Sequence, residues 1–541
     1  MPHKDHNIAQ VLEAIAATKP QATALVVKEG RKWQHYSFNR LATQCDQFAT
    51  ILHKEGISKD SRVILMVRPS FYFVALTFAL FRLGAIVILI DPGMGYRNLL
   101  RCIASVQPEV LIGIRRAIFL SQLFPKAFTS LRKRLCVHGF FPGSTNLNTL
   151  LRDNEKPPVF VANEHERAAI LFTTGSTGPP KGVCYTHGIF HAQLELIRDY
   201  YGIGEGDTDQ PGFPLFGLFS TALGIKAVLP EMNPAHPARV NPGKFVASLQ
   251  REKVSYSFGS PAIWNVVSRY CLNQKIILPL TKVLMAGAPV SGELLARMQK
   301  VLPKSAQIFT PYGATESLPV SSIEAREVVE ETWEKTKVGK GVCVGRPLPG
   351  MEIYIIKPCD NPIECWSSAS ILPTGTVGEI VARGPVVTPG YDHNDKETRQ
   401  AKIQDGNGIL HRMGDMGYLD AQGRLWFCGR KAHRVLAQEG PMYSVCCEAI
   451  FNEHPLVRRS ALVGVGRAGS QIPVIVVEPQ GRIANRKLFS QELAQLAQAN
   501  PLTQGIKDFL IHTSFPVDIR HNAKIFREQL ATWATGKLSS H

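Results

Sequence analysis

The stretch Leu171–Gly182, LFTTGSTGPPKG, carries an apolar run directly into a loop of hydroxyl residues and glycines that ends in a lysine. Hydroxyls, exposed backbone N–H groups and a lysine side chain are the groups that bind the phosphates of a nucleotide. The loop is not a Walker A motif, because Lys181 follows two prolines and precedes Gly182. A plain Gly/Ser turn is the alternative, but the ordered string T-T-G-S-T-G-x-P-K-G goes well beyond turn composition. The residues expected at the phosphates are Thr173, Thr174, Gly175, Ser176, Thr177, Gly178 and Lys181.

Short apolar runs like the one before this loop recur along the first half of the chain. Amphipathic helical segments separate them, and strands that are apolar on both faces are typical of a parallel sheet covered by helices. The runs are RVILMV (62–67), AIVILI (85–90), VLIGI (110–114), AAILF (168–172) and TKVLMAGAPV (281–290). The sequence therefore predicts an α/β fold with a doubly wound parallel sheet.

The longest apolar passage, FYFVALTFALFRLGAIVILIDPG, covers residues 71–93. Arg82 and Gly84 divide it into a helix-like piece and a strand, whereas a membrane-spanning helix needs ~20 unbroken apolar residues. The first residues lack the apolar core of a signal peptide. We therefore expect a cytoplasmic protein.

The texture of the chain changes twice in its second half. Between about residues 340 and 430, pieces such as MEIYII, VGEIVARG and GRLWFCGR alternate with Pro/Gly turns, which predicts antiparallel strands. Beyond Arg430, helical segments flank two strand-like runs, SALVGVG and IPVIVVE. A chain of 541 residues exceeds what one hydrophobic core supports. We expect a large domain over residues 1–430 and a smaller α+β domain over residues 431–541.

The net charge of +17 indicates an anionic partner: nucleic acid, an anionic membrane surface or an acidic substrate. Nucleic acid is the weakest of the three, because the sequence lacks zinc-finger spacing, a basic region followed by heptads and an RNP-type aromatic motif. The 11 cysteines form no CxxC pair and no Cys/His ligand spacing. This pattern suggests reduced thiols and no metal site built from them.

Residues 113–135, GIRRAIFLSQLFPKAFTSLRKRL, contain basic residues and no acidic one. One interpretation is a solvated helix face. The other is a basic amphipathic patch that makes peripheral contact with a membrane or guides an acidic lipid substrate. The basic residues are Arg115, Arg116, Lys126, Arg132, Lys133 and Arg134.

Four further motifs follow the phosphate loop: Ala286-Gly-Ala-Pro289, Tyr312-Gly-Ala-Thr-Glu316, Gly414-Asp415 with Gly429-Arg430, and Arg520-His-Asn-Ala-Lys-Ile525. In this order they resemble the adenylate-forming superfamily of acyl-CoA synthetases, nonribosomal-peptide adenylation domains and luciferases. The resemblance runs from about residue 10 to 535. It implies ATP and Mg²⁺ as cofactors, a small β-barrel beside the parallel sheets, and a mobile C-terminal lid that carries a catalytic lysine.

The resemblance places a group of residues around the nucleoside. The turn at Ala286–Pro289 would lie along the adenine, Tyr312 would stack on it, and Asp415 would accept hydrogen bonds from both ribose hydroxyls. Arg430 would brace the nucleotide near the hinge, with a buried Asp–Arg ion pair as the alternative. The whole group is Gly287, Ala288, Pro289, Tyr312, Gly313, Ala314, Asp415 and Arg430.

The same resemblance assigns the groups that act on the α-phosphate. Thr315 would contact it and Glu316 would bind Mg²⁺, since a carboxylate oxygen suits a hard cation. Lys181 and Lys524 would neutralise charge while a carboxylate attacks. The catalytic residues implied are thus Lys524, Lys181 and Thr315.

The strings HRMGDMGYLDAQGRLWFCGRKAHRV, PYGATESLPV and FPVDIRHNAKIFRE look most like the β-lactone synthetases of bacterial long-chain olefin biosynthesis. This resemblance implies a long-chain 2-alkyl-3-hydroxy fatty acid as substrate, and the thiolase-like, reductase and β-lactone decarboxylase enzymes of that pathway as assembly partners. Phe213, Phe216 and Phe219 would line the acyl pocket, with plain core packing as the alternative. His187 is a candidate general base in this pocket, or else a packed histidine.

Several positions depart from the common pattern of the superfamily. Met413 stands in place of a threonine, Ala432 in place of a hinge Asp or Lys, and Ala523 in place of a glycine. Ser220-Thr221 stand where the lactone-forming relatives would have Asp-Pro. The first three changes argue against thiolation by coenzyme A as the second step. An acyl-CoA or acyl-carrier ligase is the rival enzyme, and a binding or scaffold protein that has lost activity is the rival of another class.

Overall fold

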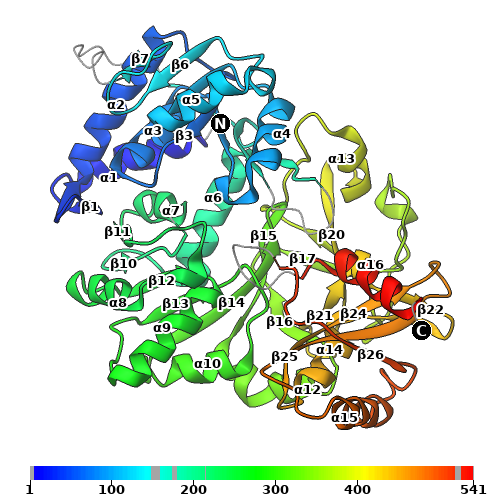
Figure 1. Cartoon of the computed structure of the whole chain (residues 1–541). Coiled ribbons are helices and arrows are strands. Elements are labelled where there is room, and N and C mark those ends of the chain that lie inside the picture. Colours follow the sequence, from blue (N-terminus) through cyan, green and yellow to red (C-terminus); the bar gives the residue numbers. More distant parts are fainter. Residues whose placement is uncertain (1–4, 148–158, 173–178, 214, 518–524, 540–541) are drawn as a thin grey trace.

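The computed structural model describes residues 5–147, 159–172, 179–213, 215–517 and 525–539. Two large sheets and the helices that pack on them form the main part of the structure, and a smaller C-terminal part packs beside the second sheet (Figure 1). The α/β class predicted from the apolar runs is confirmed.

The first sheet has seven strands in the order β7-β6-β5-β3-β4-β8-β9, all parallel except the last pair. Alternate residues of β3 face opposite layers: Val63 and Leu65 pack with helices α2 and α3, whereas Ile64 packs with α4 and α5. This is the doubly wound arrangement. The strands are β3 (Arg62–Met66), β4 (Ile86–Leu89), β5 (Val110–Gly113), β6 (Lys133–Cys136), β7 (Thr145–Asn146), β8 (Arg167–Phe172) and β9 (Gly182–Thr186). The helices are α1 (Ile8–Thr18), α2 (Phe38–Lys54), α3 (Phe71–Arg82), α4 (Tyr96–Val106), α5 (Arg115–Leu123) and α6 (His187–Glu195).

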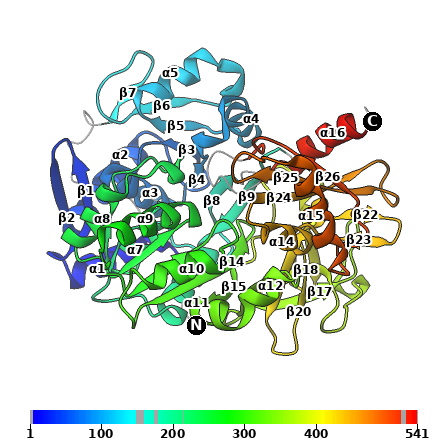
Figure 2. The same cartoon turned by 60° about the horizontal axis from the view of Figure 1, so that its bottom comes forward.

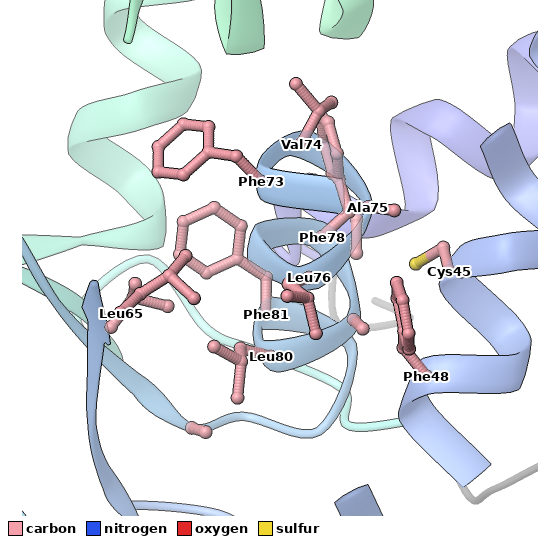
Figure 3. Close-up of a cluster of buried hydrophobic side chains, with 14 of the residues drawn as sticks. Cys45, Phe48, Leu65, Phe73, Val74, Ala75, Leu76, Phe78, Leu80 and Phe81 are labelled. Carbon is pink, nitrogen blue, oxygen red and sulfur yellow. The ribbon is translucent and has the colours of Figure 1, made fainter. Parts of the chain in front are cut away.

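Helix α3 is the first half of the long apolar passage, and all of its residues except Tyr72 are buried. Figure 3 shows Phe73, Phe78, Phe81, Leu76 and Leu80 of this helix, with Leu65 of β3 on one side and Cys45 and Phe48 of α2 on the other. A helix that is apolar on every side belongs in the middle of a core. In the described part of the chain, we find no helix with both the length and the apolarity to cross a membrane.

The segment 113–135 differs from the predicted helix face. It forms α5, a short turn and then β6, so its basic residues lie on different elements. Lys133 pairs with Glu55 at 2.7 Å, and Arg134 donates a hydrogen bond to Ser121 at 2.9 Å. Pro125 ends α5, because proline cannot continue a helix. The exposed basic residues are Arg115, Arg116, Lys126 and Arg132.

The second sheet has fourteen strands among the described residues, in the order β17-β18-β20-β21-β16-β15-β14-β13-β12-β10-β11-β1-β2, with β19 on β20. Strands β10 to β14 pair in parallel, and β14 to β21 pair in antiparallel fashion. The strands expected as a small β-barrel are therefore paired as a continuation of this sheet. They join the rest of the sheet through β15, which pairs with β16.

The second sheet consists of short and long strands with helices packed on it. Its strands are β1 (Thr23–Glu29), β2 (Lys32–Ser37), β10 (Thr208–Asp209), β11 (Lys226–Val228), β12 (Tyr256–Gly259), β13 (Lys282–Met285), β14 (Gln307–Ala314), β15 (Ser317–Glu324), β16 (Val342–Pro347), β17 (Glu352–Ile356), β18 (Gly378–Arg383), β19 (Lys402–Asp405), β20 (Gly408–Leu419) and β21 (Leu425–Arg430). Its helices are α7 (Phe216–Ala222), α8 (Pro242–Arg251), α9 (Pro261–Gln274), α10 (Gly292–Gln299), α11 (Ala325–Glu327), α12 (Trp333–Lys337) and α13 (Asp395–Ala401).

The C-terminal part begins where β21 ends at Arg430. Two of its hydrophobic clusters consist only of residues beyond 430, while a third, small cluster joins Cys446 to Met416 and Cys428 of the second sheet. Figure 2 shows this part beside the antiparallel strands of that sheet. Its elements are β22 (Val435–Ala437), β23 (Gly440–Met442), α14 (Ser444–Asn452), β24 (Val457–Val465), β25 (Ile472–Pro479), α15 (Arg486–Gln498), β26 (Asp508–Ile511) and α16 (Arg527–Leu538).

Candidate active site

A cavity of about 2650 Å³ lies between the two sheets and the C-terminal part. Small-molecule sites usually measure ~300–1,000 Å³, so this cavity has room for more than one ligand group. It reaches the carboxyl ends of the parallel strands of both sheets, where ligands of open α/β sheets bind. The described motif residues on its wall are Lys181, Gly287, Ala288, Pro289, Tyr312, Gly313, Ala314, Thr315, Glu316, Asp415 and Arg430.

The phosphate loop joins two antiparallel strands. Phe172 at the end of β8 is the register partner of Gly182 at the start of β9, so the loop starts and ends at paired positions of the sheet. A Cβ atom on Gly182 would lie 2.9 Å from Ile170, which explains a glycine there. The predicted contacts Thr173, Thr174, Gly175, Ser176, Thr177 and Gly178 lie outside the described residues.

Lys181 is held at the cavity by two neighbours from α13 and the turn before it. Its ammonium group pairs with the Glu397 carboxylate and lies 5.1 Å from the ring centroid of Tyr391. An anion entering the loop would compete with Glu397 for this cation. Nothing in the sequence singles out Glu397, because a charge in the short helix DKETRQA is typical of a solvated face.

The Tyr312–Glu316 motif forms the turn between β14 and β15. The register shifts between Tyr312 and Ala314, and a Cβ atom on Gly313 would lie 2.6 Å from the backbone oxygen of Ser317. Only glycine therefore fits the second position of this motif without displacing backbone. The hydroxyl of Tyr185 donates to the backbone oxygen of Thr315 at 2.6 Å, which fixes the turn against β9.

Three motif residues from three strands contact one another. Tyr312 donates a hydrogen bond to Asp415 at 2.6 Å, and Arg430 pairs with the other oxygen of that carboxylate at 2.9 Å. Asp415 and Arg430 are register partners of β20 and β21. Burial and the Asp415 charge raise the pKa of Tyr312 well above its usual value, and the same charge raises the pKa of Arg430. An ionised carboxylate has about four acceptor positions, so Asp415 keeps capacity for ribose hydroxyls.

Glu316 lies near two residues that the sequence did not reveal, Tyr391 and Lys402. Tyr391 donates a hydrogen bond to its Oε1 at 2.8 Å. Lys402 is 3% exposed, and its ammonium group donates to Thr388 at 3.2 Å. Burial lowers the pKa of Lys402 to about 7, against the opposing effect of the Glu316 charge. From the sequence alone, a lysine in the short strand KIQD would be expected to be exposed. Its burial is seen only in the folded structure.

The turn predicted to face adenine follows β13. Gly287 has φ of +99°, a region that favours glycine, and Ala286, Ala288 and Pro289 line the cavity with it. This agrees with the sequence prediction of a small-residue turn after a strand.

Phe213, Phe216 and Phe219 all line the cavity. The ring of Phe216 lies 5.8 Å from that of Phe213 and 5.7 Å from that of Phe219, and it stacks on Phe258 of β12 at 4.1 Å. We call these four residues the Phe cluster. Ser220 and Thr221 are buried instead: Ser220 donates to Asp209, and Thr221 donates back to the helix backbone at Gly217.

The structure corrects the placement of His187 in the substrate pocket. Its side chain is fully buried, is not among the cavity-lining residues, and packs edge-on against Phe81. Burial and the neighbouring His191 and His6 lower the pKa of His187 to about 3. The reason is local: Thr186 caps α6, and the first residue of that helix points into the core against the N-terminal segment, where Ile8 donates to its ring.

The C-terminal motif falls only partly within the described chain. Lys524 and Ala523 lie outside it, whereas Ile525 lines the cavity. Ala432 also lines the cavity, and Met413 is buried among the antiparallel strands.

Comparisons with known proteins agree with these features. The sequence profile described as AMP-binding enzyme matches residues 12–392. The chain is 42% identical to "Olefin beta-lactone synthetase" of Stenotrophomonas maltophilia, covering 93% of this chain and 91% of that protein. It is 43% identical to the protein of the same name from Xanthomonas campestris pv. campestris, with 98% and 97% covered. Among solved structures, O-succinylbenzoate coenzyme A synthetase from Bacillus subtilis, in complex with ATP and magnesium ion, superposes with a TM-score of 0.75 at 19% identity over 96% of this chain and 98% of that one.

Proposed function

We propose that this chain, which belongs to the AMP-binding enzyme family, is a β-lactone synthetase. It would use ATP to adenylate the carboxylate of a long-chain 2-alkyl-3-hydroxy fatty acid, and then close the 3-hydroxyl onto the activated carbonyl. The observation that carries the proposal is the nearly full-length match to two relatives named for that product. The cavity supports it, because one space is lined both by the nucleotide motifs and by the Phe cluster.

The first step makes the carboxylate reactive. A carboxylate is a poor acylating agent, because its leaving group would be oxide. Attack of one carboxylate oxygen on the α-phosphorus of ATP forms a mixed anhydride and releases pyrophosphate. Lys181 and Lys524 would offset the charge on the phosphates, with the hydroxyl of Thr315 at the α-phosphate. Lys181 must exchange Glu397 for phosphate as the nucleotide enters.

Glu316 would hold Mg²⁺ at this step. The fit is adequate, because Mg²⁺ commonly takes one or two carboxylates and fills its other positions with phosphate oxygens and water. Tyr391 fixes one oxygen of Glu316, which leaves a carboxylate of set orientation on the cavity wall. A bound Mg²⁺ supplies electrostatic stabilisation of the charge on the phosphate oxygens.

The second step needs no further substrate. The 3-hydroxyl oxygen attacks the carbonyl carbon and loses its proton to solvent, while the bond between that carbon and the phosphate oxygen breaks and AMP departs. Nucleophile and carbonyl belong to one molecule, and well-oriented groups of this kind reach effective molarities of ~10⁵ M or more. This offsets part of the strain of a four-membered ring. His187 is not available as the base, because it is buried in the core.

The rival reading is an acyl-CoA ligase, which would share the first step. It would need a thiol to reach the carbonyl after the C-terminal part rotates. Ala432, on the cavity wall immediately after Lys431, removes the side chain usual at that hinge. We therefore favour ring closure over thiolation.

We further propose that residues 431–541 act as a lid domain that brings Lys524 to the cavity. Two hydrophobic clusters confined to this part support it as a separate folding unit. Assembly with thiolase-like, reductase and β-lactone decarboxylase enzymes, and peripheral contact with an anionic membrane, are the partner proposals. The exposed basic residues of α5 and the turn after it support the second of these.

The test is to incubate the protein with ATP and a racemic 3-hydroxy fatty acid, with and without coenzyme A. We expect AMP, pyrophosphate and a β-lactone with its high-frequency carbonyl stretch, without any need for the thiol. Lys181→Gln is the control for nucleotide-dependent turnover. Efficient acyl-CoA formation from a fatty acid that lacks the hydroxyl would establish the rival reading instead.

A further inference from the structure

The cavity has a second apolar wall that the nucleotide and the Phe cluster leave unused. It crosses the carboxyl ends of the seven-stranded sheet and ends on α5. We call it the α5 arm, and its apolar residues are Met66, Ile90, Tyr96, Phe119, Leu120, Leu123 and Phe124. The Phe cluster, by contrast, belongs to the fourteen-stranded sheet and its helix α7.

The α5 arm begins beside the phosphate loop. Leu171, just before that loop, is the register partner of Leu89 at the end of β4. Next to β4 lies β3, and next to β3 lies β5, which leads through Ile114 directly into α5. Three strand spacings of ~4.8 Å put α5 roughly 14 Å from the phosphate loop along this edge. The arm thus runs from the end of β8 to the surface at α5, with Arg68 and Asp91 as its charged lining residues near the strand ends.

The outer end of the arm exposes large apolar side chains. Phe119 is 54% exposed, Leu123 57% and Tyr96 72%. Exposed apolar residues that gather at a cavity mouth usually mark a binding surface. Helices α4 and α5 also carry four arginines and no acidic residue, and Arg116 itself lines the cavity. Such a rim attracts the anion of a fatty acid towards the opening.

We propose that the α5 arm binds the second alkyl chain of a branched, two-chain carboxylic acid while the Phe cluster binds the first. This rests on the proposed function. In a 2-alkyl-3-hydroxy acid the two chains leave adjacent carbons, so an activated carboxyl group at the phosphate loop sends them in different directions. Two apolar walls of one cavity, one on each sheet, match this shape. A single-chain acid would leave the α5 arm empty.

The experiment compares substrates that differ only in the 2-alkyl group. AMP release and lactone formation are measured for one 3-hydroxy acid without a 2-alkyl group and for a series with 2-alkyl chains of increasing length. In the unmodified protein, kcat/KM should rise roughly fourfold for each methylene that enters the arm. Leu123→Asp places a charge in the arm and should flatten that rise, lowering the ratio of two-chain to one-chain kcat/KM at least tenfold.

Leu272→Asp is the matched control. Leu272 is also an exposed helical leucine, at 39%, on α9, and it is not among the cavity-lining residues. Its substitution should leave the length dependence intact. Leu120→Trp, which fills the arm without a charge, should act like Leu123→Asp, so that an effect of charge alone is recognised.

The outcomes separate the two proposals. If the unmodified protein makes no lactone from any of the acids, the proposed function fails. If it makes lactone but the length dependence survives both α5 variants, the α5 arm is not the second chain site. If Leu123→Asp lowers turnover only when the acid is delivered from anionic vesicles, the exposed face is a membrane contact and this inference is overturned.

Discussion

The nucleotide side and the acyl side of the cavity are built on different principles. On the nucleotide side, Asp415 already holds Tyr312 and Arg430, and Glu316 already holds Tyr391, each through a directed contact. On the acyl side, Phe216 packs between Phe213, Phe219 and Phe258 without any directed contact. Each buried polar group needs its own directed partner, because a buried charge without one costs free energy. Apolar contacts have no preferred direction, so an apolar wall needs only enough surface to contact the chain. Substitutions should therefore be far more damaging on the first side than on the second.

The largest effect is expected from Glu316→Gln and Asp415→Asn. Both keep the shape of the side chain and remove the charge that faces nucleotide or metal. We expect AMP release to fall about 10²–10³-fold, the usual loss when one charge-stabilising group is removed. The measurement is ATP–pyrophosphate exchange with the hydroxy acid present.

Asn and Gln are the right replacements at these positions. Asp415→Ala would leave Arg430 and Tyr312 without their carboxylate in a buried place, so lost activity and lost folding would be confounded. A melting temperature near that of the unmodified protein is the control. If either variant keeps near-normal ATP–pyrophosphate exchange, the polar contacts on the nucleotide side are structural only. The difference between the nucleotide side and the acyl side would then not hold.

Phe216→Ala tests the acyl side and should cost less. Removing one ring from the Phe cluster loses contact area with a chain, and a buried phenylalanine is worth ~1.5–3 kcal/mol, or roughly 10- to 100-fold in kcat/KM for long acids. A short-chain hydroxy acid that never reaches the ring should show little change. Equal losses for short and long acids would mean that Phe216 supports the fold and not the chain.

Lys402→Met tests whether the buried lysine next to Glu316 makes the stability of the protein depend on pH. Because burial lowers the folded pKa of Lys402 to about 7 from its usual value near 10.5, the unfolded chain binds more protons between these values. Lys402 therefore makes the free energy of unfolding rise from pH 7 towards pH 10, by at most ~1.4 kcal/mol per pH unit. The methionine variant should lose this slope, which urea unfolding at pH 7 and pH 9 measures. An unchanged slope would show that Lys402 is charged and solvated in the folded protein.

The smallest effect is expected at the surface. Lys126 and Arg132 are exposed, and each basic residue near an anionic bilayer contributes ~1 kcal/mol. Lys126→Gln with Arg132→Gln should weaken binding to phosphatidylserine vesicles by roughly tenfold to thirtyfold without changing ATP use. Lys133 and Arg134 are poor choices for this test, because they contact Glu55 and Ser121 within the fold. Unchanged vesicle binding would mean that these basic residues are only solvated and make no contact with a membrane.

The sequence predicted the parts of the molecule that short motifs encode. The strands from RVILMV to AAILF and the small-residue turn at Ala286–Pro289 lie as expected, since neighbouring residues determine each of them. Tyr391 and Glu397 could not be identified from the sequence, because their partners lie far along the chain: Glu316 is 75 residues from Tyr391, and Lys181 is 216 residues from Glu397. Lys402 could not be identified because its short strand gives no sign of its burial.

Tertiary packing decided two questions that the sequence left open. His187 follows the phosphate loop in sequence, but the helix it begins turns its ring into the core. The basic segment reads as one helix, yet a proline divides it and sends its end into a strand. In both cases a residue's neighbours suggested a surface that the three-dimensional packing assigned elsewhere.

Helix α3 has a consequence for the order of events during synthesis. Its core partners include Ala168 and Ala169 of β8, and roughly 90 residues lie between the end of α3 at Arg82 and the end of β8 at Phe172. At ~5–20 residues per second, a ribosome takes about 5–20 s to make that interval. For those seconds a segment with four phenylalanines is without the strand that later covers it. Cellular yield should therefore depend on translation speed and chaperone supply between these two points more than on the stability of the finished protein.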